Sequence, residues 1–266
     1  MTDNAFTAIL EFVEDELSFA TSHYNEGYLE RRIASRKRRI QCETDDAYLE
    51  VLRTDPDEQE ALLEAMSINV TEFFRNPEVW NAIRTVLRAL SRSVETVDVW
   101  SAACADGREA YSLAMLAHDD PQLDPSAIRI HGTDISESAL ETARNGVYTA
   151  SQTIDLSDQL SFLDDHSPYV DVDGQTYRIS DELKQTVTFE RHDLINDGPK
   201  SGFDLVVCRN LFMYIDSEYK RSVLRTIEQS LRPRGFLVIG KAETIPSSVK
   251  PIFAVCDARR RIYRRE

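Results

Sequence analysis

Apolar residues recur at helical spacing through the first third of the chain, and alternating runs of β-branched residues are missing there. The predicted helices cover residues 4–19, 27–40, 44–53, 56–68 and 77–90. We therefore expect an all-helical N-terminal domain over residues 1–92.

From Val94 onward, short apolar strands alternate with amphipathic helices. The predicted strands cover residues 96–100, 128–132, 187–190, 203–208 and 235–239, and the helices cover 107–117, 137–145 and 218–231. This alternation is typical of βαβ units. Residues 93–266 should therefore form an α/β domain whose mostly parallel sheet carries helices on both faces.

Residues 148–186 interrupt this alternation. Asp173 and Gly174 form a turn signal between two stretches of alternating residues, which predicts a small antiparallel hairpin. Such an insertion has no role in building the main sheet. It is either a partner-binding subdomain or a plain surface hairpin, and the pattern leaves both open.

Composition narrows the classes of function. A formal net charge of −15 argues against nucleic acid as the main partner, because phosphate binding needs an excess of Lys and Arg. No apolar run approaches the roughly 18 residues of a membrane span, and the start lacks the pattern of an export signal. The four cysteines lie far apart without a CxxC pair, so we expect no metal and a reducing cytosol.

The turn after the first predicted strand, residues 99–107, is rich in small residues. Ligands of open α/β sheets bind beyond the carboxyl ends of the strands, where small residues let the backbone approach closely. The GxGxxG fingerprint is missing, which favours a nucleoside cofactor over a dinucleotide, with tight packing as the alternative. Asp134, at the end of the second strand, would accept hydrogen bonds from a ribose or cap the helix near Ser136.

Two further segments carry polar residues beside apolar ones. Arg209 and Asn210 directly follow the buried strand 203–208, where polar side chains are costly without partners, so a site explains them better than packing does. The stretch 67–75 interleaves apolar residues with Asn69, Thr71 and Arg75, for which helix capping is the alternative.

Four motifs occur in order along the chain: Asn69-Val-Thr-Glu-Phe-Phe-Arg75, Trp100-Ser-Ala-Ala-Cys-Ala-Asp-Gly-Arg-Glu-Ala-Tyr-Ser112, Gly132-Thr-Asp-Ile135 and Cys208-Arg-Asn-Leu-Phe-Met-Tyr214. Together they closely resemble the CheR-type chemotaxis methyltransferases, and the resemblance covers nearly the whole chain. It implies a class I methyltransferase-like sheet domain with an antiparallel subdomain, behind a helical N-terminal domain. It also implies S-adenosylmethionine as the cofactor, S-adenosylhomocysteine as the product and receptor glutamates as the substrate.

The resemblance further implies roles for single residues. The implied cofactor-binding set is Asn69, Thr71, Arg75, Ala102, Glu109, Asp134, Asp193, Leu194, Arg209 and Asn210. Within it, Glu109 would lie near the methionine end, Asp134 would hold the ribose, and Asp193 with Leu194 would lie beside the adenine. The family pattern usually has two glutamates after the glycine, whereas this chain has Arg108 before Glu109.

Methyl transfer to a carboxylate is an in-line displacement that needs no general base, because glutamate is ionised near neutral pH. Catalysis should come from positioning the carboxylate and from excluding water. We assign this task to Arg75, whose forked donors can hold the carboxylate, and to the Tyr214 hydroxyl.

The predicted helix 27–40 carries six basic residues in an otherwise acidic chain. Arg32, Arg36 and Arg39 flank its apolar stripe. The resemblance implies a docking surface for an acidic helix of a chemotaxis receptor. A solvated helix face, balanced by nearby acids, is the alternative.

Two other functions would keep the same cofactor site. One is a carboxyl methyltransferase for another substrate, and the basic helix argues against a small one. The other is a non-catalytic S-adenosylmethionine-binding adaptor in signalling, and the presence of Arg75 and Tyr214 argues against it. We expect a monomeric, cytoplasmic protein without membrane insertion.

The chain holds 25 Arg, only six Lys and 46 acidic residues. Acid-rich, lysine-poor surfaces suit concentrated salt, so we hypothesise a halophilic host. Self-repulsion should loosen the fold at low ionic strength and weaken once the Debye length falls to a few ångströms. The thermal midpoint should therefore rise between about 0.1 M and about 3 M KCl, and equal midpoints would refute the hypothesis.

Overall fold

The computed structural model describes residues 4–17, 19–66 and 71–266. The chain forms two compact units. The helical unit comprises Met1–Ile68 with Phe212–Lys220, and the sheet unit comprises Asn69–Leu211 with Arg221–Glu266. No helix in the described residues is long and apolar enough to cross a bilayer.

The described part of the helical unit contains four α-helices and a short 3-10 turn. They are α1 (Asn4–Leu17), η1 (Thr21–His23), α2 (Glu26–Arg39), α3 (Asp45–Thr54) and α4 (Pro56–Met66). Their apolar stripes meet in a core that buries Ile9, Leu29 and Leu52. Inside this unit, Glu58 is buried and accepts hydrogen bonds from Arg36 and from the Tyr48 hydroxyl.

A strip of nine residues, Phe212–Lys220, belongs to the helical unit although it follows a strand of the sheet unit. The Asn25 side chain donates to the Met213 carbonyl at 3.0 Å, and the Asp216 amide donates to the His23 carbonyl at 2.7 Å. The Tyr214 ring packs on the Tyr28 ring with centroids 4.9 Å apart. The chain therefore passes between the two units three times.

The sheet unit is built on seven strands in the order β6-β2-β1-β7-β8-β10-β9. The strands are β1 (Val97–Ala102), β2 (Ile128–Asp134), β6 (Val187–Arg191), β7 (Phe203–Cys208), β8 (Leu231–Ile239), β9 (Phe253–Asp257) and β10 (Ile262–Arg265). The first five are parallel, and β10 is antiparallel to both β8 and β9. The predicted mostly parallel sheet is confirmed.

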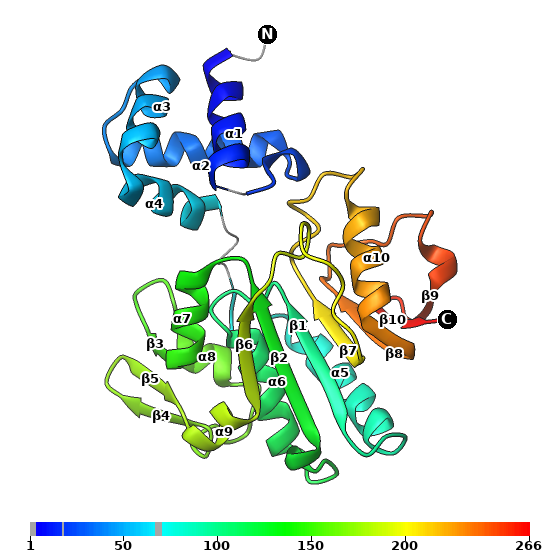
Figure 1. Cartoon of the computed structure of the whole chain (residues 1–266). Helices are drawn as coiled ribbons and strands as arrows, with labels where there is room; N and C mark the ends of the chain where they lie inside the picture. Colours follow the sequence, from blue (N-terminus) through cyan, green and yellow to red (C-terminus); the bar gives the residue numbers. More distant parts are fainter. Residues whose placement is uncertain (1–3, 18, 67–70) are drawn as a thin grey trace. The chain divides into compact units, whose positions relative to one another are not determined.

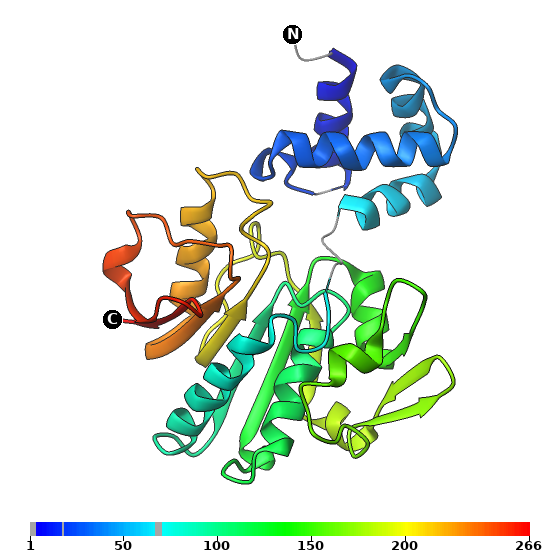
Figure 2. The same cartoon turned by 180° about the vertical axis from the view of Figure 1, so that it is seen from behind.

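Helices lie on both faces of this sheet. They are α5 (Pro77–Ser91), α6 (Arg108–Asp119), α7 (Glu137–Asn145) and α10 (Lys220–Ser230). Figure 2 shows α5 and α6 along one face, and Figure 1 shows α10 on the other. The predicted domain boundary at residue 92 is too late, because α5 buries its apolar face, including Trp80 and Ile83, in the core formed with β1 and α6.

The insertion is a three-stranded antiparallel sheet in the order β3-β5-β4. Its elements are β3 (Val147–Thr149), α8 (Leu156–Leu160), β4 (Val170–Asp173), β5 (Thr176–Ile179) and α9 (Asp181–Gln185), and short 3-10 turns lie at Pro125–Ala127 and Lys250–Ile252. The predicted hairpin around Asp173 and Gly174 is therefore correct, and β3 adds a third strand that the pattern did not reveal.

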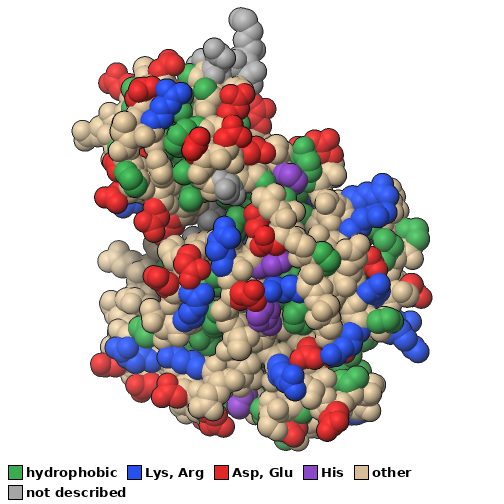
Figure 3. All heavy atoms as spheres, viewed as in Figure 1, with side chains coloured by type: hydrophobic (Ala, Val, Ile, Leu, Met, Phe, Trp, Pro, Cys, Tyr) green, Lys and Arg blue, Asp and Glu red, His purple; other side chains and the backbone are tan. Residues whose placement is uncertain are grey.

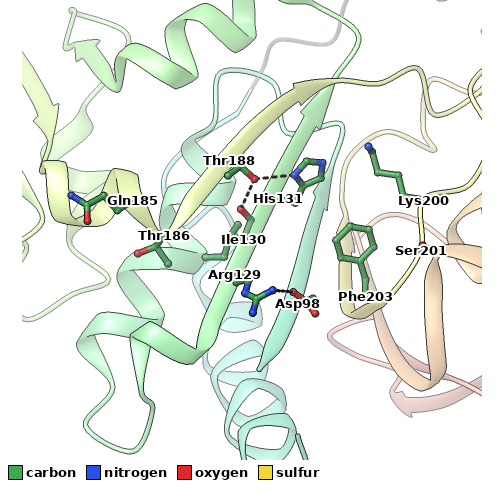
Figure 4. Close-up of a pocket in the computed structure, with 10 residues that line it drawn as sticks. All are labelled: Asp98, Arg129, Ile130, His131, Gln185, Thr186, Thr188, Lys200, Ser201 and Phe203. Atoms are coloured by element: carbon green, nitrogen blue, oxygen red, sulfur yellow. Dashed lines mark hydrogen bonds and ion pairs between the residues drawn. The ribbon is translucent and has the colours of Figure 1, made fainter. Parts of the chain in front are cut away.

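The chain returns from β6 to β7 through residues 192–202 without a helix, although parallel crossovers usually contain one. A hollow of about 560 Å³ lies on this part of the sheet (Figure 4). Several of its polar side chains already have partners: His131 shares a hydrogen bond with Thr188 at 2.9 Å, and Lys200 pairs with Glu190 at 2.8 Å. We interpret the hollow as a solvated face of the sheet.

Candidate active site

The turn after β1 places backbone at the carboxyl edge of the sheet. Ala103 and Ala105 adopt left-handed φ angles of 57° and 49°, which few non-glycine residues do. Gly107 has a φ of 84°, and a Cβ atom there would lie 2.7 Å from the Ala143 Cβ and 2.9 Å from the Phe189 ring. Only glycine fits at position 107, and its presence allows α6 to begin immediately after the tight turn.

Asp134, the last residue of β2, ties this turn to the neighbouring strand. Its Oδ2 accepts the Ala105 amide at 2.8 Å, and its Oδ1 accepts the Ser136 amide at 3.0 Å. The cap of α7 is Ser136, whose hydroxyl accepts the Ala139 amide, so the alternative of Asp134 as the helix cap is wrong. Burial raises the pKa of the Asp134 carboxyl, and the backbone hydrogen bonds oppose that rise.

Glu109, in the first turn of α6, forms a buried ion pair with Arg209, which follows β7. The Arg209 Nη1 to Glu109 Oε2 distance is 3.3 Å, and the Ser101 hydroxyl donates to Glu109 Oε1 at 2.9 Å. Burial raises the pKa of the Glu109 carboxyl, while the Arg209 charge lowers it. A buried charge without a partner is costly, so each of the two residues needs the other. Their ion pair therefore joins α6 to the end of β7.

The other end of the Arg209 guanidinium holds the backbone at Arg75. Its Nη2 donates to the Arg75 carbonyl at 2.7 Å and to the Asn76 side-chain oxygen at 3.1 Å. The indole N–H of Trp80 donates to the same Arg75 carbonyl at 3.0 Å. The guanidinium carbon also lies 5.5 Å from the Trp80 ring centroid, within cation–π range.

We refer to residues 73–76 as the Arg75 segment. The Phe73 amide donates to Gln159 Oε1, and the Phe74 amide donates to the Ser112 hydroxyl, each at 3.0 Å. Phe74 and Asn76 adopt left-handed φ angles of 48° and 57°. Strained backbone of this kind persists only where surrounding contacts hold it, and such strain gathers at functional sites.

Asn210 is fixed by an acid that sequence reasoning missed. The Asn210 backbone amide donates to Glu243 Oε2 at 3.2 Å, and the Gly240 backbone amide donates to the same oxygen at 2.6 Å. A Cβ atom on Gly240 would lie 2.6 Å from that oxygen. Glu243 gave no sequence signal because it follows the last parallel strand without a recognisable motif.

The remaining residues predicted to bind the cofactor differ in burial and in hydrogen bonding. Ala102 ends β1 and is buried, Leu194 is buried in the turn after β6, and Thr71 is half-buried. Asp193 accepts the amides of Ile195 and Asn196, which makes it the cap of its own turn. Asn69 lies outside the described residues.

Arg108 points back into the turn that precedes it. Its guanidinium pairs with Asp106 at 2.9 Å and lies 5.8 Å from the Tyr148 ring centroid. The Tyr148 hydroxyl in turn donates to the Asp106 carbonyl at 2.7 Å. The departure from the family's two glutamates therefore has a structural role here, since Arg108 fastens the cofactor turn to the insertion.

Tyr214 and the basic helix belong to the helical unit. Arg32 stacks over the Tyr28 ring at 5.0 Å, and Arg39 is exposed. Arg36 is different: it forms an ion pair with the buried Glu58 at 2.5 Å. The expectation that Arg36 presents a charge for docking is therefore corrected, because its guanidinium serves the interior of the unit.

With this geometry in place, comparisons with known proteins can be interpreted. The model of the CheR methyltransferase SAM-binding domain matches residues 69–262, and the model of the CheR methyltransferase all-alpha domain matches residues 4–67. The chain belongs to the CheR methyltransferase family. The predicted family, its S-adenosylmethionine cofactor and the methyltransferase class are thereby confirmed, and the two matches meet where the two units divide.

The chain is also similar to individual proteins. The chemotaxis protein methyltransferase of Listeria monocytogenes is 34% identical over 88% of this chain and 87% of its own length, and that of Salmonella typhimurium is 26% identical over 94% and 87%. An uncharacterized 104.1 kDa protein of Rhodobacter capsulatus is 35% identical over 90% of this chain, which spans 25% of that protein. A solved TehB-like methyltransferase from Corynebacterium glutamicum aligns with a TM-score of 0.40 at 12% identity, covering 69% of this chain and 88% of its own.

The two donors on the Arg75 carbonyl generate a prediction. Trp80→Phe keeps a buried ring but removes one donor, which is worth about 1 kcal/mol. The methyl-transfer turnover number should fall about three- to tenfold, while the dissociation constant of S-adenosylhomocysteine in calorimetry changes less than about twofold. Tyr111→Phe is the matched control, since it removes a buried donor to the Ala143 carbonyl. An equal loss of turnover in the control would show that only general stability was affected.

Proposed function

We propose that this chain transfers the methyl group of S-adenosylmethionine to glutamate side chains of chemotaxis receptors in the cytoplasm. The observation that carries the proposal is the Arg75 segment, whose backbone is held by α5, α6, α8 and Arg209 at the carboxyl edge of the sheet. A guanidinium carried by backbone that is fixed at this edge would suit a carboxylate substrate, because its planar fork of donors matches the geometry of carboxylate oxygens.

The residues at this edge fit S-adenosylmethionine. The turn of small residues after β1 lets a nucleoside lie against the backbone, and the absence of Cβ atoms at Gly107 and Gly132 keeps the strand ends close together. Asp134 would accept hydrogen bonds from the ribose hydroxyls, and Glu109 would face the ammonium group of the methionine part. When bound, S-adenosylmethionine supplies a sulfonium methyl group that a carboxylate can displace.

The chain's own contribution would be orientation. Arg75 would hold the glutamate carboxylate with one oxygen left for attack, and the Tyr214 hydroxyl would direct the other oxygen. Too strong a bond to Arg75 would weaken the nucleophile, so the guanidinium must orient more than it neutralises. No residue has to accept a proton, because the substrate carboxylate is already ionised near neutral pH.

Receptor docking would use basic residues of α2, above all the half-buried Arg32 and the exposed Arg39. Arg36 would support this surface indirectly, through its ion pair with Glu58. Reversal of the Arg36 charge would leave Glu58 buried without its partner and damage the fold, so docking tests should leave this residue intact.

Asp134→Ala tests the cofactor site. The ribose hydroxyls would lose a charged acceptor worth about 1.5–3 kcal/mol, so the affinity for S-adenosylhomocysteine should fall tenfold or more in calorimetry. Asp124→Ala is the matched control, since Asp124 also accepts the amide of the residue two positions on. Unchanged affinity in a folded Asp134→Ala variant would limit Asp134 to fastening the turn.

Tyr214→Phe tests the positioning of the carboxylate. The Tyr214 hydroxyl makes no hydrogen bond within the described residues, so the change leaves the ring packing on Tyr28 in place. The turnover number should fall by about one to two orders of magnitude with normal cofactor affinity. Tyr219→Phe removes a hydroxyl from the same strip and should have little effect. Wild-type turnover in Tyr214→Phe would exclude the tyrosine from the mechanism.

A further inference from the structure

Charge is distributed unevenly along this acidic chain. The last 26 residues, 241–266, contain seven Lys or Arg and three Asp or Glu, although the whole chain has a formal charge of −15. Figure 3 shows Lys and Arg side chains on the side of the sheet unit that carries α10 and the C-terminal strands. The positive charge of this region therefore needs its own explanation.

Four of these basic residues meet at one place in the fold. The turn between β9 and β10 leads into β10 at the carboxyl end of β8, because Ile262 pairs with Val238. The Ile239 amide donates to the Arg261 carbonyl at 3.2 Å, and Arg261 Nε donates to the Lys241 carbonyl at 3.3 Å. We call Lys241, Arg259, Arg260 and Arg261 the basic rim.

The basic rim adjoins the Arg75 segment within the sheet unit. Arg260 Nε donates to the Glu78 carbonyl in the first turn of α5, two residues after Asn76. Arg259, Arg260 and Lys241 also share a recess of about 10 Å³ with Asn76 and Arg209. The recess is too small for a ligand. It shows that the rim is packed against the backbone clamp of the candidate active site.

The acids near the rim leave part of its charge uncompensated. Lys241 pairs with Glu78 at 2.7 Å, and Arg260 pairs with Asp257 at 2.7 Å. Arg259 and Arg261 have no carboxylate within 4.0 Å among the residues that the structure describes. The rim therefore keeps a net positive charge at the sheet edge that carries Arg75 and Asn76.

We infer that the basic rim is a docking surface for the acidic, glutamate-bearing segment of the protein substrate. The inference rests on the proposed function, because a protein that presents glutamates for methylation brings negative charge to this edge. Carboxylates that flank the target would be attracted to Arg259 and Arg261, which raises the local concentration of substrate beside the Arg75 segment. Such attraction acts on substrate affinity and weakens with salt, whereas it leaves the cofactor site unchanged.

Arg259→Gln combined with Arg261→Gln tests the rim. A matched control is Arg225→Gln combined with Arg234→Gln, which removes the same charge from α10 and from the start of β8 at the opposite edge of the sheet. Arg261 and Arg234 share left-handed φ angles of 57° and 66°, so these two positions also match in backbone conformation. At about 50 mM NaCl, the Michaelis constant for a purified receptor cytoplasmic fragment should rise about five- to tenfold in the rim variant and less than about twofold in the control.

The difference between the two variants should shrink as NaCl is raised to about 0.5 M, and the turnover number and S-adenosylhomocysteine affinity should match wild type. Equal Michaelis constants in both variants at low salt would overturn the inference. Fluorescence anisotropy with labelled poly-L-glutamate separates this failure from failure of the proposed function, since it needs no methyl transfer. Weaker binding of poly-L-glutamate by the rim variant alone would support the docking surface even if the wild-type protein methylated no receptor. Equal binding by the wild-type protein, the rim variant and the control variant would refute the docking surface.

Discussion

The buried ion pair between Glu109 and Arg209 is the constraint on which the candidate active site depends. It joins the first turn of α6 to the residue after β7, and Ser101 of β1 completes it. Loss of one partner would leave an uncompensated buried charge, at a cost of about 3–5 kcal/mol. Because the same guanidinium also holds the Arg75 carbonyl, the rigidity of the parallel sheet extends to the segment that presents Arg75.

Backbone strain is concentrated around this pair. Eight non-glycine residues of the described chain have positive φ angles, and five of them lie in the Arg75 segment, in the turn after β1 or directly after Arg209: Phe74, Asn76, Ala103, Ala105 and Asn210. Each donates or accepts a hydrogen bond through its own backbone or side chain with another part of the sheet unit, or lies in the turn that Asp134 fastens. The protein's own contacts therefore fix the backbone of the candidate site in the sheet unit, which favours catalysis through orientation.

The periodicity of apolar residues predicted those helices and strands whose ends are marked by capping or turn residues. Helix α7 was predicted with both ends correct, because Ser136 caps it and Gly146 ends it in a left-handed conformation. Strands β3, β9 and β10 were missed, since each has only three to five residues and is too short to show a clear alternating pattern. The predicted boundary at residue 92 was wrong for a related reason. The apolar stripe of α5 shows that this helix packs against other elements, but it does not show which unit those elements belong to.

The site motifs pointed to Glu109, Asp134 and Arg209. The role of Trp80 could not be predicted, because its sequence position is typical of any aromatic residue in a core. The Arg36–Glu58 ion pair could not be predicted either, because its residues lie too far apart in the sequence.

The strip Phe212–Lys220 has a consequence for the order in which the protein takes shape on the ribosome. The N-terminal helices emerge first, yet the residues that complete their unit follow only after 69–211 have been made. At about 5–20 residues per second, that delay lasts roughly seven to thirty seconds. During this time Tyr28 lacks its Tyr214 partner and the Asn25 amide lacks its acceptor. The nascent helical unit thus lacks part of its structure until the strip has been synthesised.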